Sequence, residues 1–276
     1  MSKLNKTAFI VEGPSEAKLL NRMVKSLPDK TILDVMLILP SEMNLYMLWN
    51  DVKNEPDIDI ISYLKEKSGS IRDVLGEMNS DDFSDVYMFF DLDAQQDNIK
   101  CNSKDELIDI IKSMLNTFNN ETDKGKLYIS YPMCEAYSDY IEGTCKTFTE
   151  KCYQNPFDKG YKNRVGNNNK NAILTHLNVE KINEIINCYL CRITCLYNAD
   201  EEFDHAKAKD ISVLDIFDKQ ANLLKQELII VLSAFPEFIV DFYKLDVLRQ
   251  MFLVTDTYYN KKCENKIKSI FFEDKW

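Results

Sequence analysis

The sequence predicts an α/β protein, with a parallel sheet of about four strands in the first half and an all-helical second half. Two observations lead to this prediction. Up to about residue 142, short apolar runs alternate with segments in which apolar residues recur at helical spacing. Beyond that residue the strand-like runs fade, while the helical spacing continues. We therefore expect one domain over residues 1–142 and a helical domain over residues 143–276.

The elements of the first half can be placed in order. The first strand is predicted over Thr7–Val11 and a helix over Pro14–Leu27, since proline suits the first turn, where its missing N–H would be unpaired anyway. Ile32–Leu39 is a second apolar run and is predicted as the second strand. A helical insertion is expected over about residues 43–79.

The third and fourth strands are predicted over Val86–Asp91 and Lys126–Ser130. Ser103 and Glu106 form a capping-box pattern, which predicts that a helix begins between these two strands. The spacing of apolar residues in the second half predicts helices over residues 171–178, 180–198, 212–234, 236–253 and 256–272.

The composition indicates a globular protein without a membrane segment. No apolar run approaches the ~18 residues of a membrane span, and the first residues do not match a signal peptide. We therefore expect a cytoplasmic protein whose 8 cysteines are reduced thiols. The net charge of −11 repels nucleic acid over most of the surface, so binding would require a local basic strip or a bound metal ion.

Acidic residues follow three of the predicted strands. Glu12 and Glu16 come after the first strand, Asp91 and Asp93 close the third, and Glu135 follows the fourth. Because ligands gather beyond the carboxyl ends of parallel strands, we expect these side chains at one edge of the sheet. In an extended chain, Asp91 and Asp93 would also project to the same side. Clustered carboxylates are costly unless a cation neutralises them, and Mg²⁺ or Mn²⁺ suits such oxygen ligands.

The order of strands and acidic residues resembles the TOPRIM domain, the metal-binding module of topoisomerases, primases and several nucleases. The segment from Val11 to Glu16 resembles in particular the nucleases of the OLD family and related phage-defence proteins. The resemblance covers about residues 7–142 and implies a Rossmann-like sheet. It also implies a Mg²⁺ or Mn²⁺ site in which Glu12, Asp91 and Asp93 hold the principal, catalytic ion. A second site would be completed by Glu16 and Glu135.

The function implied by this resemblance is a metal-dependent nuclease that hydrolyses phosphodiester bonds in DNA or RNA, in defence against phage. The sequence has no P-loop pattern, so a separate ATPase is the implied partner. Two alternatives stay open. One is a Mn²⁺-dependent nucleotide-sugar glycosyltransferase, which would use only Asp91 and Asp93, and the other is a non-catalytic TOPRIM sensor subunit of an ATPase complex. The apolar face from Leu223 to Phe242 could be core or the surface of a homodimer.

Two further clusters could carry function. A basic segment could contact the phosphate backbone and stack a tyrosine on a base, or could be a solvated loop; its residues are Lys159, Tyr161, Lys162, Arg164 and Lys170. Three cysteines on one predicted helix could bind metal together with His205; they are Cys188, Cys191 and Cys195. Three thiolates on one helix are unusual for zinc, so packing as small apolar residues is the favoured interpretation.

Overall fold

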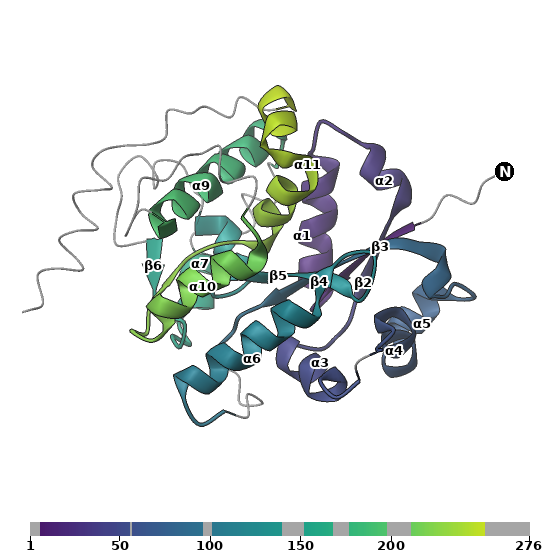
Figure 1. The fold of residues 1–276 in the computed structure, drawn as a ribbon. Helices are drawn as coiled ribbons and strands as arrows, with labels where there is room; N and C mark the ends of the chain where they lie inside the picture. Colours follow the sequence, from purple (N-terminus) through teal and green to yellow (C-terminus); the bar gives the residue numbers. More distant parts are fainter. Residues whose placement is uncertain are drawn as a thin grey trace, which may run out of the picture.

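The structure, a computed structural model, describes residues 6–55, 57–95, 101–139, 152–167, 177–197 and 211–251. A five-stranded sheet lies at its centre, in the order β2-β1-β3-β5-β4 (Figure 1). The strands are β1 (Lys6–Val11), β2 (Met36–Pro40), β3 (Phe83–Asp91), β4 (Asn119–Asn120) and β5 (Gly125–Ser130). All pairs are parallel except β4 with β5 at the edge. The predicted α/β fold with a mostly parallel sheet is therefore confirmed.

The strand order reverses at β1. From β1 the chain passes to β2 on one side and then to β3 on the other side. The connections that leave the carboxyl ends of β1 and β3 therefore diverge, and open α/β sheets form their ligand-binding crevice at such a point. Val11 pairs with Phe89, and Asp91 pairs with Ser130, so the carboxyl ends of β1, β3 and β5 lie side by side.

Helices cover both faces of the sheet (Figure 1). One face carries α1 (Pro14–Lys25) and α11 (Ala234–Met251), and the other carries α3 (Leu45–Val52), α4 (Ile60–Lys67), α5 (Gly69–Leu75) and α6 (Lys104–Thr117). A 3₁₀ turn, η1 (Ser80–Asp82), leads into β3. Residues 43–79, which the sequence predicts to be mostly helical, contain α3, α4 and α5. Polar side chains cap each of these three helices at its start and satisfy N–H groups that the helix leaves unpaired; they are Asn44, Asp59 and Ser68.

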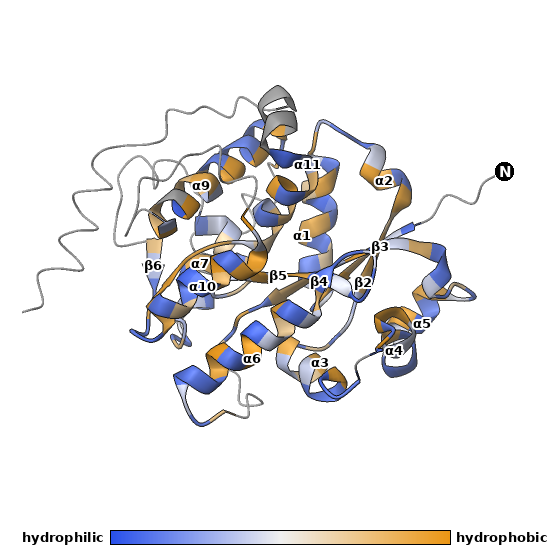
Figure 2. Ribbon diagram, viewed as in Figure 1, coloured by the Kyte–Doolittle hydropathy of each residue, from blue (hydrophilic) through white to orange (hydrophobic). Residues whose placement is uncertain are grey.

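The second half contributes α7 (Tyr161–Asn167), α9 (Val179–Tyr197) and α10 (Val213–Leu224) beside α11. Figure 2 shows hydrophobic and hydrophilic residues alternating along α9 and α10, as expected for helices that bury one face. None of the helices in the described ranges is both long enough and apolar enough to cross a membrane.

The predicted second strand is wrong at its start. Residues 31–35 form a short helix, α2 (Thr31–Val35), and only Met36–Pro40 joins the sheet. Asp29 explains the helical start, because its side chain accepts hydrogen bonds from the backbone N–H of Thr31 at 2.9 Å and from its hydroxyl at 2.8 Å. Periodicity alone does not separate a buried strand from a short buried helix.

The prediction of an all-helical second half is also wrong. In the described part of that half, β6 (Tyr153–Gln154) pairs antiparallel with β7 (Ile229–Ile230). The predicted helix over residues 212–234 therefore ends at Leu224. Gln220 accounts for the strand, because its buried amide bonds both backbone groups of Ile230, at 2.7 and 2.9 Å. A side chain thus satisfies polar groups that a helix would have paired internally.

Aromatic packing joins α11 to the sheet. Phe238 on α11 makes edge-on contacts with four rings of β1, β3 and β5, with ring centroids 4.9–5.8 Å apart; they belong to Phe9, Tyr87, Phe89 and Tyr128. One cluster of buried apolar residues runs from β1 to α11. The boundary near residue 142 stays a prediction, and the buried ring of Phe238 belongs to the core rather than to a dimer surface.

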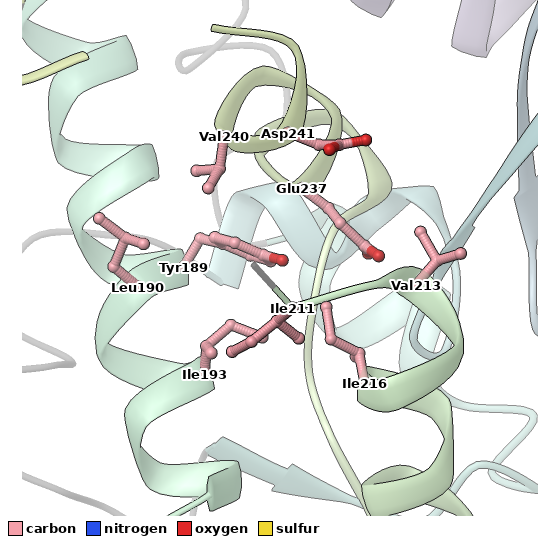
Figure 3. Close-up of a pocket in the computed structure, with 9 residues that line it drawn as sticks. All are labelled: Tyr189, Leu190, Ile193, Ile211, Val213, Ile216, Glu237, Val240 and Asp241. Carbon is pink, nitrogen blue, oxygen red and sulfur yellow. The ribbon is translucent and has the colours of Figure 1, made fainter. Parts of the chain in front are cut away.

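A cavity lies between α9, α10 and α11 (Figure 3). Its walls are mainly apolar, and Glu237 points into it. The Glu237 side chain is 4% exposed, and its Oε2 has no hydrogen-bond partner among the described residues. Burial raises the pKa of Glu237 well above its usual value, and nearby Asp241 adds to this, whereas Lys126 opposes it.

Candidate metal centre

The candidate site lies at the carboxyl ends of β1, β3 and β5, where the strand order reverses. Glu12 directly follows β1, Glu16 lies in the first turn of α1, and Asp91 is the last residue of β3. Among the residues that the structure describes, one cluster brings three ligand-type atoms within 4.8 Å of one another; it consists of Glu16, Asp91 and Cys134. The structure therefore brings together side chains that are far apart in the sequence, as predicted for the carboxylates.

Asp91 lies at the centre of the cluster. Burial raises the pKa of Asp91 well above its usual value, and the negative charges of Glu12, Glu16 and Glu135 raise it further. The backbone N–H of Cys134 donates to the Asp91 carboxylate and partly offsets these effects. An ionised Asp91 is therefore costly in the protein alone and calls for a cation.

Glu12 has a similar environment. Burial, together with the charges of Glu16 and Asp93, raises the pKa of Glu12 to about 7. A hydrogen bond from the backbone N–H of Asp91 and the charge of Lys162 act in the opposite direction. The Oε2 atom of Glu12 is buried and accepts no hydrogen bond from the described part of the chain. This oxygen needs a proton or a cation.

Asp93 lies in a tight turn after β3. Its backbone φ is +31°, so the prediction of an extended backbone through Asp93 is wrong. The turn is held by hydrogen bonds from the N–H of Leu92 to Ser130 and from the N–H of Asp93 to Pro132, both at 2.9 Å, and by the Tyr46 hydroxyl on the Leu92 carbonyl. Asp93 nevertheless lies close enough to Glu12 to raise the pKa of that carboxyl group.

Glu135 reaches the cluster from the segment after β5. It lies in the 3₁₀ helix η2 (Cys134–Asp139) and is 1% exposed. One of its oxygens, Oε1, is 3.5 Å from Nζ of Lys162, and the other, Oε2, is 3.9 Å from Sγ of Cys134. Glu135 also raises the pKa of Asp91. All five predicted carboxylates therefore take part in one electrostatic cluster, although only Glu16 and Asp91 belong to the three-atom group.

Lys162 is a cation at the edge of this cluster. Its burial lowers the pKa, but Glu135, Cys134 and Asp91 outweigh that effect and the pKa of Lys162 is raised. The sequence predicted Lys162 only as a backbone contact and identified no lysine for the metal site. It could not reveal this role, because Lys162 is 27 positions beyond Glu135 in the chain and reaches it only through the packing of α7 on η2.

The structure supports only part of the prediction for the basic segment. Tyr161 is 1% exposed and its hydroxyl donates to Asp139 at 2.6 Å, so its predicted stacking on a base is wrong. The segment forms α7 rather than a solvated loop. Lys159 and Arg164 are exposed, with Arg164 paired to Asp158 at 2.5 Å, and Lys170 lies outside the described residues.

The cysteines of α9 pack in the helical half. Cys191 and Cys195 are buried and Cys188 is partly buried. Within the described ranges they form no three-ligand group, and His205 lies outside those ranges. Cys134 is the cysteine that sequence reasoning missed. Its position directly before Glu135, after the fourth predicted strand, was the available signal.

The donor set fits a divalent metal ion. It contains the carboxylates of Glu16 and Asp91 and the thiol of Cys134, with the carboxylates of Glu12, Asp93 and Glu135 interacting beside them. One oxygen of Glu12 has no hydrogen-bond partner among the described residues, and Lys162 is the nearby cation. A pocket opens beside Glu16, Asp91 and Cys134. Its other walls are apolar residues of β1, α1 and β3, together with Ser130 and the segment over residues 233–235. Comparison of the chain with protein-family models, curated proteins and solved structures finds no match.

Proposed function

We propose that this chain is a divalent-metal-dependent nuclease that hydrolyses phosphodiester bonds in DNA or RNA. The observation that supports it best is the convergence of Glu12, Asp91 and Asp93 where the strand order reverses between β1 and β3. These residues would hold the principal Mg²⁺ or Mn²⁺ ion, and Glu16 and Glu135 would complete a second position. A bound divalent ion would neutralise the phosphate and activate a water molecule.

The residues of the chain orient the carboxylates before any ion arrives. The N–H of Asp91 donates to Glu12, and the N–H of Cys134 donates to Asp91, so the segments at the ends of β1, β3 and β5 are linked through the site itself. Backbone donors of this kind fix the direction in which each carboxylate offers its remaining lone pairs. Without a cation, the site would repel a phosphate group. The proposed reaction therefore depends strictly on metal.

Lys162 is placed to contact the substrate. Its side chain is 65% exposed, and its ammonium group lies 3.5 Å from the buried Glu135 at the edge of the site. A phosphate that approached the carboxylates would meet this positive charge. Two further proposals, a role in defence against phage and an ATPase partner, follow from the TOPRIM resemblance alone. A homodimer is proposed only from the apolar face between Leu223 and Phe242.

Cleavage assays with a site variant test the proposed nuclease. Plasmid, single-stranded DNA and total tRNA would be incubated with Mg²⁺, Mn²⁺ or EDTA, using the wild type and Glu12→Gln. A metal ion stabilises the transition state by several kcal/mol, and loss of one of its ligands removes part of this stabilisation. We therefore expect the rate of cleavage to fall on the order of 10²-fold or more.

The matched control is Glu66→Gln, which should cleave like the wild type. Glu66 is an exposed residue of α4, and α4 lies on the face of the sheet opposite α1 and α11. Equal cleavage by Glu12→Gln and the wild type would contradict the proposal. Absence of cleavage by the wild type in every metal, with no metal binding by calorimetry, would favour the sensor alternative.

A second prediction concerns Lys162. Lys162→Ala should raise KM about tenfold, since one charged contact of about 1.4 kcal/mol is lost. The slope of log KM against log salt should fall by about one, because one fewer counterion is released. Lys159→Ala is the control, an exposed lysine three positions earlier in the same segment. Equal effects of the two variants would show a diffuse basic surface instead of a contact made by Lys162.

A further inference from the structure

Cys134 places a sulfur atom inside the acidic site. Its Sγ lies 3.3 Å from Oε1 of Glu16 and 3.9 Å from Oε2 of Glu135. A carboxylate oxygen of Asp91 completes the group in which all ligand-type atoms lie within 4.8 Å of one another. Cys134 is 8% exposed and is the first residue of η2, four positions after the end of β5. Glu16 and Cys134 are 118 positions apart in the chain, so the fold alone brings them together.

The spacing of these atoms suits one metal ion. In a tetrahedral zinc site, bond lengths of about 2.3 Å to sulfur and 2.0 Å to oxygen place the two ligand atoms about 3.5 Å apart. The observed separation of Cys134 Sγ and Glu16 Oε1 is 3.3 Å. Three protein ligands with a fourth position left to water or substrate is also the usual composition of a catalytic zinc site.

The three residues also face a common space. Glu16, Asp91 and Cys134 all line one pocket, whose other walls include Val11, Phe89 and Phe235. The fourth position of an ion held by the three residues would therefore open into this pocket. The neighbouring carboxylates are otherwise arranged for oxygen ligation, because Glu12 interacts with Asp93 and keeps one buried oxygen without a partner in the described chain.

We propose that the Cys134 thiolate is a metal ligand, together with Glu16 and Asp91, and that this part of the site selects a thiophilic divalent ion of the zinc class. Mg²⁺ takes oxygen ligands, whereas zinc and cobalt(II) accept mixed sulfur and oxygen donors. On binding, the thiol proton leaves to solvent and a sulfur–metal bond forms. Glu12 and Asp93, with Asp91 as a shared ligand, remain as an all-oxygen position for Mg²⁺ or Mn²⁺. The inference rests on the proposed function only in placing the ion at the same site.

Cobalt(II) alone is the probe that tests this inference. The full-length, metal-free chain, kept reduced with a non-chelating reductant, would be titrated with Co²⁺ in the absence of substrate. Thiolate ligation produces a charge-transfer band in the near ultraviolet, which we expect in the wild type and expect to be lost in Cys134→Ser. Addition of Zn²⁺ should displace Co²⁺ and remove the band, whereas excess Mg²⁺ should not.

Two further variants complete the test. The double variant Cys188→Ser/Cys191→Ser, in the helical half, should keep the band. Glu16→Gln keeps the thiol but should weaken Co²⁺ binding at least about tenfold, because even outer-shell partners of a metal contribute that much. If circular dichroism shows that Cys134→Ser is unfolded, the Co²⁺ affinity of Glu16→Gln tests the inference in its place.

No band in the wild type, or a band unchanged in Cys134→Ser, would overturn the inference. Because the readout needs no cleavage, it separates the two proposals. Mg²⁺-dependent cleavage without a cobalt band would leave the nuclease standing and remove the thiolate ligand. A Cys134-dependent band without cleavage of any nucleic acid would support the thiolate ligand and contradict the proposed nuclease.

Discussion

Asp91→Asn is expected to abolish cleavage and, at the same time, to stabilise the metal-free protein. The variant loses the central ligand of the site, and a metal ion contributes several kcal/mol to the transition state, so activity should fall on the order of 10³-fold. Stability should change in the opposite direction, because burial and then the charges of Glu12, Glu16 and Glu135 raise the pKa of Asp91. Asparagine keeps the shape of the side chain and removes the repulsion.

The pH dependence follows from the raised pKa. An unfolded aspartate loses its proton near pH 4, whereas Asp91 in the folded protein holds its proton to higher pH. Between these two values the folded state binds more protons, so wild-type stability falls as the pH rises, by at most about 1.4 kcal/mol per pH unit. The difference in melting temperature between Asp91→Asn and the wild type in EDTA should therefore grow with pH.

Thermal unfolding in EDTA and with added metal, run beside cleavage assays, measures both effects. The matched control is Asp85→Asn, the same substitution at the opposite end of β3, which should leave cleavage unchanged. Metal should raise the melting temperature of the wild type, because it binds only the folded state, and should have little effect on Asp91→Asn. Full activity in Asp91→Asn would contradict the assignment of the site.

The second large effect is expected for Glu237→Gln. Glu237 points into the cavity between α9, α10 and α11 (Figure 3), and no functional role is predicted for it. Burial is the largest cause of its raised pKa. Its folded pKa lies above that of an unfolded glutamate, which is about 4.3. As the pH rises from that value to the folded pKa, the wild type loses up to about 1.4 kcal/mol per unit. Glutamine stays neutral and avoids this loss.

Melting temperatures between pH 5 and pH 8 in EDTA check this prediction. Each kcal/mol corresponds to about 2–4 °C in a protein of this size, so the variant should gain several degrees at the upper end of the range. Near pH 5 the two proteins should differ little. Glu77→Gln is the control, because Glu77 is exposed and its substitution should not alter the pH profile. A lower melting temperature for Glu237→Gln at pH 8 would show that the ionised carboxylate is stabilised in the cavity.

Local sequence patterns predicted the first half well. Pro14 at the first turn of α1 and Ser103 before α6 mark helix starts by interactions within a few residues, and both helices begin where these patterns predict. The errors occurred where hydrogen bonds from single polar side chains decide the backbone conformation. The second strand starts late because Asp29 favours a helical turn at Thr31, and β7 forms because Gln220 bonds Ile230 from a neighbouring helix. Neither partner can be recognised from apolar spacing.

The sequence by itself determined where these strands end, because an apolar run followed by an acidic residue marks the burial of the strand and the more polar surroundings of its end. Glu12, Asp91 and Asp93 could be predicted on that basis. Only the tertiary structure decided which strand ends lie together, because hydrogen bonds between strands set the order β2-β1-β3-β5-β4. That order placed Cys134 beside Glu16, and the packing of α7 on η2 brought Lys162 to Glu135; both contacts join residues far apart in the chain.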